Sequence, residues 1–180
     1  MNEDTLETEN RDGYIQLPTG ENQNCFGCSL KNKSGLQMKF YATEKLDSVI
    51  SWLTVPDHLC GWSNLVHGGV ISTMLDEAMG WAALIILKKL VVSKSITVKF
   101  LKPILIGKEI RAEGMVKKIN NEREAVLQGY IYNDENEICA QSSSLASLFS
   151  LETLRKRSVM DEGMFRALEK SMNIIPTRKS

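Results

Sequence analysis

The hydrophobic residues of this chain recur with two different periods. Between Val70 and Leu87 they return every three or four residues, at Ile71, Met74, Leu75, Ala78, Ala82, Ile85 and Ile86. This spacing predicts a helix with one buried stripe. On both sides of it, alternating or β-branched apolar runs are bounded by Gly, Pro, Asn and Asp. These runs predict strands over 36–41, 49–55, 91–100, 109–119, 125–133 and 138–149.

The order of these segments limits the fold. Two strands, one long helix and four sequential strands predict an α+β arrangement, in which an antiparallel sheet wraps around a central helix and the last four strands form a meander. Residues 1–24 are polar and are expected to be flexible, whereas residues 25–150 form the domain. Residues 151–180 are expected to form an extension, with an extra C-terminal helix over Leu151–Met172.

Composition and charge narrow the range of partners. With 180 residues, 43% hydrophobic content and 22 basic against 22 acidic side chains, we expect one soluble domain. The balanced charge and the lack of a basic stripe with interleaved aromatics argue against a nucleic-acid partner. The run Ala82–Val92 is interrupted by Lys88 and Lys89, well short of the ~20 residues that cross a membrane. The first ten residues lack the features of a signal peptide, so the cytoplasm is the expected location.

The cysteines include one closely spaced pair, Cys25 and Cys28. Zinc usually takes four ligands, and Cys60, Cys139, His58 and His67 offer no second such pair. We therefore expect no metal and no cofactor, and interpret the pair as reduced cysteines that shape a turn.

The stretch Asn64–Gly69, which reads NLVHGG, directly precedes the predicted helix, and Asp76 follows six residues later. Gly68 and Gly69 allow a ligand to approach the backbone, and free N–H groups at a helix start favour an oxyanion. Asp76 lies off the apolar stripe, and at 1.5 Å per residue it is about 12 Å further along the axis than Gly68. Two antiparallel helices related by a two-fold axis would bring Asp76 of one chain to Gly68 of the other. The spacing thus predicts a dimer.

Three blocks of sequence resemble the hotdog-fold acyl-CoA thioesterases of the phenylacetate-pathway (PaaI-like) type. The first is Cys25–Cys28 with Gly35, Leu36 and Phe40; the second is Asn64–Gly69 with Leu75–Gly80; the third is Thr97–Pro103 with Gly107. Together they cover roughly residues 24–149, and the helix block is the most specific.

The resemblance implies a hotdog fold, an acyl-CoA substrate, and a homodimer or a dimer of two such dimers. It places the backbone N–H of Gly68 on the thioester carbonyl oxygen and takes the carboxylate of Asp76 from the other subunit, as general base or as nucleophile. His67 and Asn64 match motif positions that order the loop or touch the thioester. Substrate contacts are expected from Gly69 and Thr73, from Trp62, whose ring could line an acyl pocket, and from Ser93, which loosely matches a water-holding hydroxyl.

Two other functions stay open at this point. A hotdog dehydratase would need a histidine placed to abstract a proton, and only His58 and His67 are available; the third possibility is a non-catalytic acyl-CoA-binding protein. For His67 we favour a loop-ordering role over proton transfer. We expect His58 to be exposed, and Glu77, the neighbour of Asp76, to face solvent or a lysine.

Overall fold

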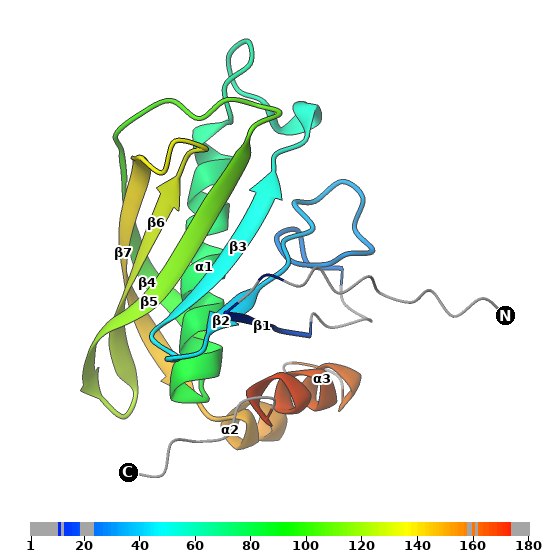
Figure 1. Ribbon diagram of the computed structural model, residues 1–180. Helices are drawn as coiled ribbons and strands as arrows, with labels where there is room; N and C mark the ends of the chain where they lie inside the picture. The colour runs from blue at the N-terminus through cyan, green and yellow to red at the C-terminus, as the bar shows by residue number, and fades with distance from the viewer. Residues whose placement is uncertain (1–10, 12, 19–23, 158–159, 161, 174–180) are drawn as a thin grey trace, which may run out of the picture.

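The centre of the protein is one long helix held in a curved sheet (Figure 1). The computed structural model describes residues 11, 13–18, 24–157, 160 and 162–173. The helix α1 spans Gly68–Leu87. The strands of the sheet are β1 (Tyr14–Gln16), β2 (Tyr41–Thr43), β3 (Ser48–Thr54), β4 (Leu90–Phe100), β5 (Glu109–Asn121), β6 (Glu124–Tyr132) and β7 (Ile138–Phe149). A short 3₁₀ helix, η1 (Asp57–Leu59), precedes α1. The predicted α+β class is confirmed.

The strand order differs from the predicted meander at one position. Neighbouring strands run antiparallel in the order β1-β2-β3-β5-β6-β7-β4, so β4 pairs with β7 and forms an edge of the sheet. The connection over 101–108 then returns the chain to β5, past the start of α1. There the N–H of Val66 donates to the carbonyl of Ile104 at 2.9 Å. The prediction failed for β4 because sheet order depends on this return path, which strand periodicity does not encode.

The predicted strand over 36–41 is also wrong, although its alternation reports burial correctly. Leu36, Met38 and Phe40 are all buried, yet only Tyr41 belongs to a strand. Gln37 has a φ of 50°, and the N–H groups of Leu36 and Met38 donate to carbonyls of the 25–28 turn. Here the backbone hydrogen bonds hold a loop against the core.

The N-terminal segment contributes a strand that the polar composition did not predict. β1 pairs with β2, and its Tyr14 ring packs edge-on against Trp52 at 5.0 Å between centroids. The Arg11 guanidinium lies 4.4 Å from the centroid of the same Trp52 ring. The flexibility expected for residues 1–24 is therefore wrong for this strand; residues 1–10, 12 and 19–23 lie outside the described part of the chain.

Helix α1 is the core of the domain. Met74, Leu75 and Ala78 are fully buried. By length and composition alone α1 is apolar enough to cross a membrane, but 61% of its apolar window is buried inside the fold, as in the core helix of a globular domain.

Two glycines bring α1 unusually close to the sheet. Gly114 of β5 and Gly129 of β6 are directly paired. A Cβ atom at Gly114 would lie 2.2 Å from the carbonyl oxygen of Ala78, so the helix backbone rests on the strand backbone. This contact lies within the same turn of helix as Asp76 and fixes the position of that turn over the sheet.

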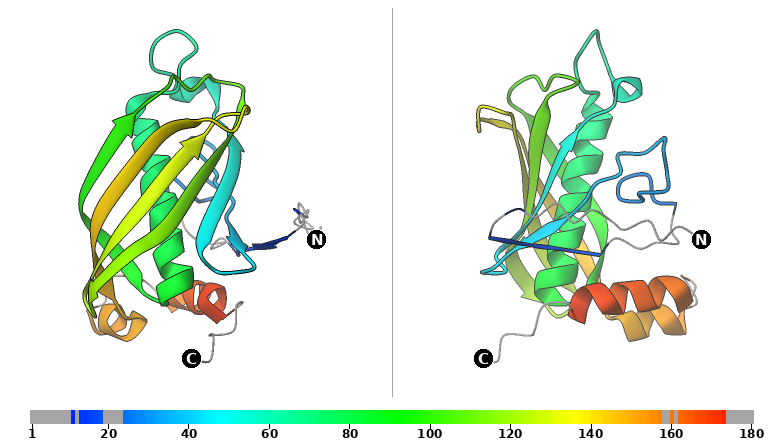
Figure 2. Two further views of the ribbon diagram at one scale, coloured as in Figure 1. Left: turned by 60° about the vertical axis from the view of Figure 1, so that its left-hand side comes forward. Right: turned by 45° about the vertical axis from the view of Figure 1, so that its right-hand side comes forward.

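The C-terminal extension contains two helices where we predicted one over Leu151–Met172. They are α2 (Leu151–Lys156) and α3 (Glu162–Asn173), which lie side by side beneath the end of α1 (Figure 2). Arg155 of α2 pairs with Glu162 at 2.9 Å and with Glu169 at 3.2 Å. These ion pairs hold the two helices against each other, so a single straight helix would not form them.

Candidate active site

The start of α1 leaves one backbone donor open. His67 is the N-cap: its ring Nδ1 accepts from the N–H of Gly69 at 3.0 Å. Its carbonyl accepts from Val70 at 2.9 Å and from Ile71 at 3.1 Å. Within the described part of the chain, the remaining N–H of this first turn, that of Gly68, meets no acceptor. The favoured role of His67 as the residue that orders the loop agrees with this geometry, and the open donor is Gly68.

The other residues predicted near this turn take different positions. Asn64 is exposed, and its backbone carbonyl accepts from the N–H of Ile106 at 2.8 Å. The Thr73 hydroxyl donates to the carbonyl of Gly69 within the same helix, at 3.0 Å. Trp62 is 87% exposed, and it lines neither the cavity at Gly68 nor the cavity at Asp76. Within the described part of the chain, no hydrogen bond joins any of these three side chains to Asp76.

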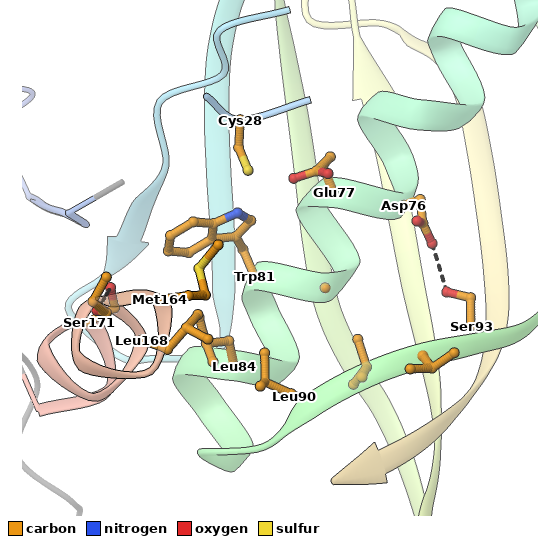
Figure 3. A pocket seen from close by; sticks show the side chains of 14 residues that line it. Cys28, Asp76, Glu77, Trp81, Leu84, Leu90, Ser93, Met164, Leu168 and Ser171 are labelled. Atoms are coloured by element: carbon orange, nitrogen blue, oxygen red, sulfur yellow. Dashed lines mark hydrogen bonds between the residues drawn. The ribbon is translucent and has the colours of Figure 1, made fainter. Parts of the chain in front are cut away.

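Asp76 lies on the exposed flank of α1 that faces the edge strand. The hydroxyl of Ser93 on β4 donates to its Oδ1 at 2.7 Å (Figure 3). Ser93 is exposed as well, so both side chains remain accessible. The hydrogen bond fixes the orientation of the carboxylate and links it to a second polar group that can hold water.

Glu77 points the other way, and our expectation that it faces solvent or a lysine is wrong. Its Oε1 lies 3.4 Å from Sγ of Cys25, and a Cβ atom at Gly27 would overlap its side chain. Burial, and then the nearby charge of the Cys25 thiolate, raise the pKa of Glu77 to about 7. The sequence could not place Glu77, because its partners come from a segment about fifty residues earlier.

The two cysteines of the pair differ in chemistry. A hydrogen bond from the Cys28 thiol, supported by backbone N–H groups, lowers the pKa of Cys25 to about 5. The same hydrogen bond, together with burial, raises the pKa of Cys28. Sγ of both cysteines and a carboxylate oxygen of Glu77 lie within 4.8 Å of one another. This is three of the four ligands that zinc usually takes, so the expectation of no metal stays a prediction.

The helix start and the carboxylate open into different cavities. A cavity of about 340 Å³ is lined by Gly68, Ile71 and Phe100, among others. A second, of about 490 Å³, contains Asp76, Glu77 and Ser93. Eight residues of helix separate Gly68 from Asp76, about 12 Å along the axis. Within one chain, the Gly68 N–H and the Asp76 carboxylate therefore lie in separate cavities.

The sequence of this region is similar to that of known proteins. Residues 63–140, which run from the loop before α1 to the start of β7, match the thioesterase superfamily. The match contains both the Gly68 turn and Asp76. An uncharacterized protein of Schizosaccharomyces pombe is 36% identical over 80 residues, which are 42% of this chain and 45% of that protein. The chain thus spans less than half the length of this curated relative.

Solved structures of thioesterase-superfamily proteins share the fold. RHA08564, a thioesterase superfamily protein, is 18% identical with a TM-score of 0.64, and the likeness covers 69% of this chain and 60% of that one. A thioesterase from Haemophilus influenzae is 23% identical with a TM-score of 0.60, and the likeness covers 68% of this chain and 85% of that one. The PaaI protein of E. coli, from the phenylacetic acid degradation operon, is 20% identical with a TM-score of 0.53, covering 56% and 76%. A Streptococcus mutans protein bound to acetyl-CoA is 19% identical with a TM-score of 0.53, covering 58% and 82%. At these identities the likeness confirms the hotdog fold.

The main features that the sequence did not indicate lie around Trp81. This residue is 8% exposed, stacks on Phe40 at 4.9 Å between ring centroids, and lines the cavity that contains Asp76. Met164 and Leu168 of α3 line the same cavity. The apolar spacing of the extension could have indicated α3, but not the surface on which it packs.

Proposed function

We propose that this protein is an acyl-CoA thioesterase of the PaaI-like type, which hydrolyses a thioester to a carboxylic acid and coenzyme A. The observation that carries the proposal is the open N–H of Gly68 on the same helix as the accessible carboxylate of Asp76. Neighbouring donors are all satisfied by His67, so the turn presents one donor in a fixed direction. The Streptococcus mutans neighbour bound to acetyl-CoA supports this class of ligand.

Each group has a defined part in hydrolysis. The N–H of Gly68 donates to the thioester carbonyl oxygen as it gains negative charge, which is worth about 3–4 kcal/mol for one such donor. Asp76 either deprotonates the attacking water or attacks the carbonyl carbon itself; in the second case the resulting anhydride is hydrolysed by water, which releases the carboxylic acid and restores the Asp76 carboxylate. In both routes the carbon–sulfur bond breaks and the thiolate of coenzyme A leaves and takes up a proton. Ser93 holds the Asp76 carboxylate or the water in position.

The site requires a second copy of the chain. Asp76 is about 12 Å from its own Gly68 along the helix axis, so a partner must supply the missing half. The edge strand β4 supports a homodimer, because its apolar side chains Val92 and Phe100 are 58% and 56% exposed. An antiparallel pair of α1 helices would give two equivalent sites per dimer. A dimer of two such dimers preserves the same sites.

The alternative functions predict different outcomes. A dehydratase would use a histidine as its base, but Nδ1 of His67 caps α1 and His58 is exposed on η1. A non-catalytic binding protein would bind acyl-CoA without releasing thiol. The measurement that separates them is the appearance of free coenzyme A thiol, followed with a thiol reagent over a panel of acyl-CoA esters.

Asp76→Asn tests the mechanism, because it keeps the shape of the side chain and removes its basicity. We expect kcat to fall by at least about a hundredfold, with acyl-CoA binding and oligomeric state unchanged. Asp57→Asn, at an exposed aspartate of η1, is the matched control and should keep full activity. If Asp76→Asn retains the wild-type kcat, the proposed role of this carboxylate is wrong.

A further inference from the structure

The cavity that contains Asp76 continues along α1 to the C-terminal extension. It encloses about 490 Å³ between α1, β4 and α3. Asp76 and Ser93 lie at one end, and Met164 and Leu168 of α3 lie at the other, with Trp81 between them (Figure 3). The two carboxylates of the cavity, those of Asp76 and Glu77, belong to one turn of α1. Beyond that turn the walls are largely apolar.

One face of α3 closes the far end. The residues of α3 that line the cavity are spaced by three or four positions, at Met164, Ala167, Leu168 and Ser171, so they form a single face of the helix. Leu84 near the end of α1 and Leu90 at the start of β4 complete this end. The extension therefore contributes a wall to the cavity and does not merely cover the outside of the domain.

This wall is fixed to the domain by several contacts. Phe165 is 1% exposed, and the Arg155 guanidinium lies 5.0 Å from the centroid of its ring. The ammonium group of Lys88, the C-cap residue of α1, donates to the carbonyl of Met172. The Ser171 hydroxyl lies 3.1 Å from the carbonyl of Pro18. With Phe165 buried and its C-terminal end held by these contacts, α3 sets the length of the cavity.

That length can be converted into a number of carbon atoms. From Asp76 to Leu84 the helix advances eight residues, about 12 Å. An extended chain advances about 1.2 Å per bond, because three backbone bonds span 3.3–3.6 Å. An acyl chain with its thioester at Asp76 would therefore reach α3 with roughly ten carbons.

We propose that α3 is the end wall of an acyl-chain pocket and that the substrates are thioesters of aliphatic acids with about eight to twelve carbons. This rests on the proposed thioesterase function and specifies the acyl group. Shorter acyl groups leave the α3 end unfilled, whereas longer chains meet Leu168. Each methylene that enters an apolar pocket is expected to raise kcat/KM about fourfold, until the chain reaches the wall.

The test compares butyryl-, octanoyl-, decanoyl-, dodecanoyl-, tetradecanoyl- and palmitoyl-CoA in the wild type and in two variants of Leu168. Leu168→Trp fills the far end, and we expect kcat/KM for decanoyl-CoA to fall at least tenfold while that for butyryl-CoA changes less than twofold. Leu168→Ala removes three carbon atoms from the wall, so the preferred chain should lengthen by two or three carbons. Arg166→Trp, at an exposed position of α3, is the control and should leave the profile unchanged.

The two Leu168 variants separate a wall from a merely structural contact. If α3 only stabilises the fold, both variants lower the activity on every chain length alike, and the proposal is overturned. Opposite shifts of the preferred length support it. Because Leu168→Ala adds no bulk, it keeps the test decisive if Leu168→Trp does not fold.

Binding of the same esters distinguishes this inference from the proposed function. Hydrolysis with a chain-length profile that Leu168 does not alter overturns the pocket and leaves the thioesterase. Length-dependent binding that Leu168→Trp abolishes, without release of thiol, supports the pocket and overturns the enzyme. If the protein neither binds nor hydrolyses any of these esters, both the acyl-chain pocket and the proposed thioesterase function are overturned.

Discussion

Replacement of Gly68 by proline removes one N–H group and tests whether that group stabilises the reaction. Gly68 is the first residue of α1, the position at which proline is best tolerated in a helix. Loss of one oxyanion donor costs about 3–4 kcal/mol, so kcat should fall by roughly 10²–10³. Because His67 satisfies the next three N–H groups, no neighbouring donor can take over. The assay is release of coenzyme A thiol under saturating decanoyl-CoA.

The matched control is Gly68→Ala, which adds a side chain but keeps the N–H. Its Cβ would lie 3.5 Å from Cζ of Phe100, an ordinary contact, so its kcat should stay within a few-fold of the wild type. Circular dichroism and sedimentation must first show that both variants fold and assemble. If the folded Gly68→Pro protein turns over as fast as Gly68→Ala, the oxyanion role of this N–H is refuted.

Mixed dimers extend the same perturbation to the shared site. Gly68→Pro and Asp76→Asn homodimers should each be nearly inactive. A mixed dimer combines an intact Gly68 from one chain with an intact Asp76 from the other at one of its two sites. Random mixing makes half of the dimers mixed, so about a quarter of wild-type activity should return. No recovery in a sample proven to be mixed would show that the two groups do not act together across an interface.

Three further predictions concern the surroundings of the site. Burial raises the pKa of Glu77 to about 7, above its unfolded value, so the stability it contributes is present below about pH 4.5 and is lost as the pH rises through 7. The wild type should therefore lose unfolding free energy relative to Glu77→Gln between pH 5 and pH 8 in urea titrations; parallel curves would contradict the raised pKa. The pKa of Cys25 is lowered to about 5 whereas that of Cys28 is raised, so iodoacetamide at pH 7 should alkylate Cys25 first, as peptide mass spectrometry would show. Gly114→Ala should destabilise the protein by about 3 kcal/mol or more, because its Cβ would overlap the α1 backbone. Gly129→Ala, whose Cβ meets only side-chain atoms, should cost less stability in thermal unfolding. Equal losses in the two variants would count against the backbone contact.

The sequence predicted best those elements whose signal is local. Helix α1 and strands β3 to β7 follow directly from their hydrophobic periods, and the Gly68 turn with Asp76 follows from motif spacing. The partner of β4 was not predictable, because it depends on the return path over 101–108. The stretch Leu36–Phe40 shows that alternation reports burial rather than pairing, since its N–H groups bond to a loop.

The candidate site was predicted only where its residues share one segment. Asp76 and Gly68 lie on the same helix, so their separation could be calculated from the sequence. Glu77 takes its environment from Cys25 and Cys28, and Trp81 takes its environment from Phe40 and α3. Such contacts join distant parts of the chain, and neither periodicity nor composition encodes them.

The backbone contact at Gly114 separates the parts of this protein that can vary from the part that cannot. Because the turn that carries Asp76 rests on strand backbone, its height over the sheet is set by covalent dimensions and not by side-chain volume. The other end of the cavity, at Leu84, Leu90 and Leu168, is built from side chains alone. Substitutions there can reshape the cavity without moving the carboxylate. A designer who wished to change the acyl group could therefore work from the C-terminal helix inward and leave the reacting end intact.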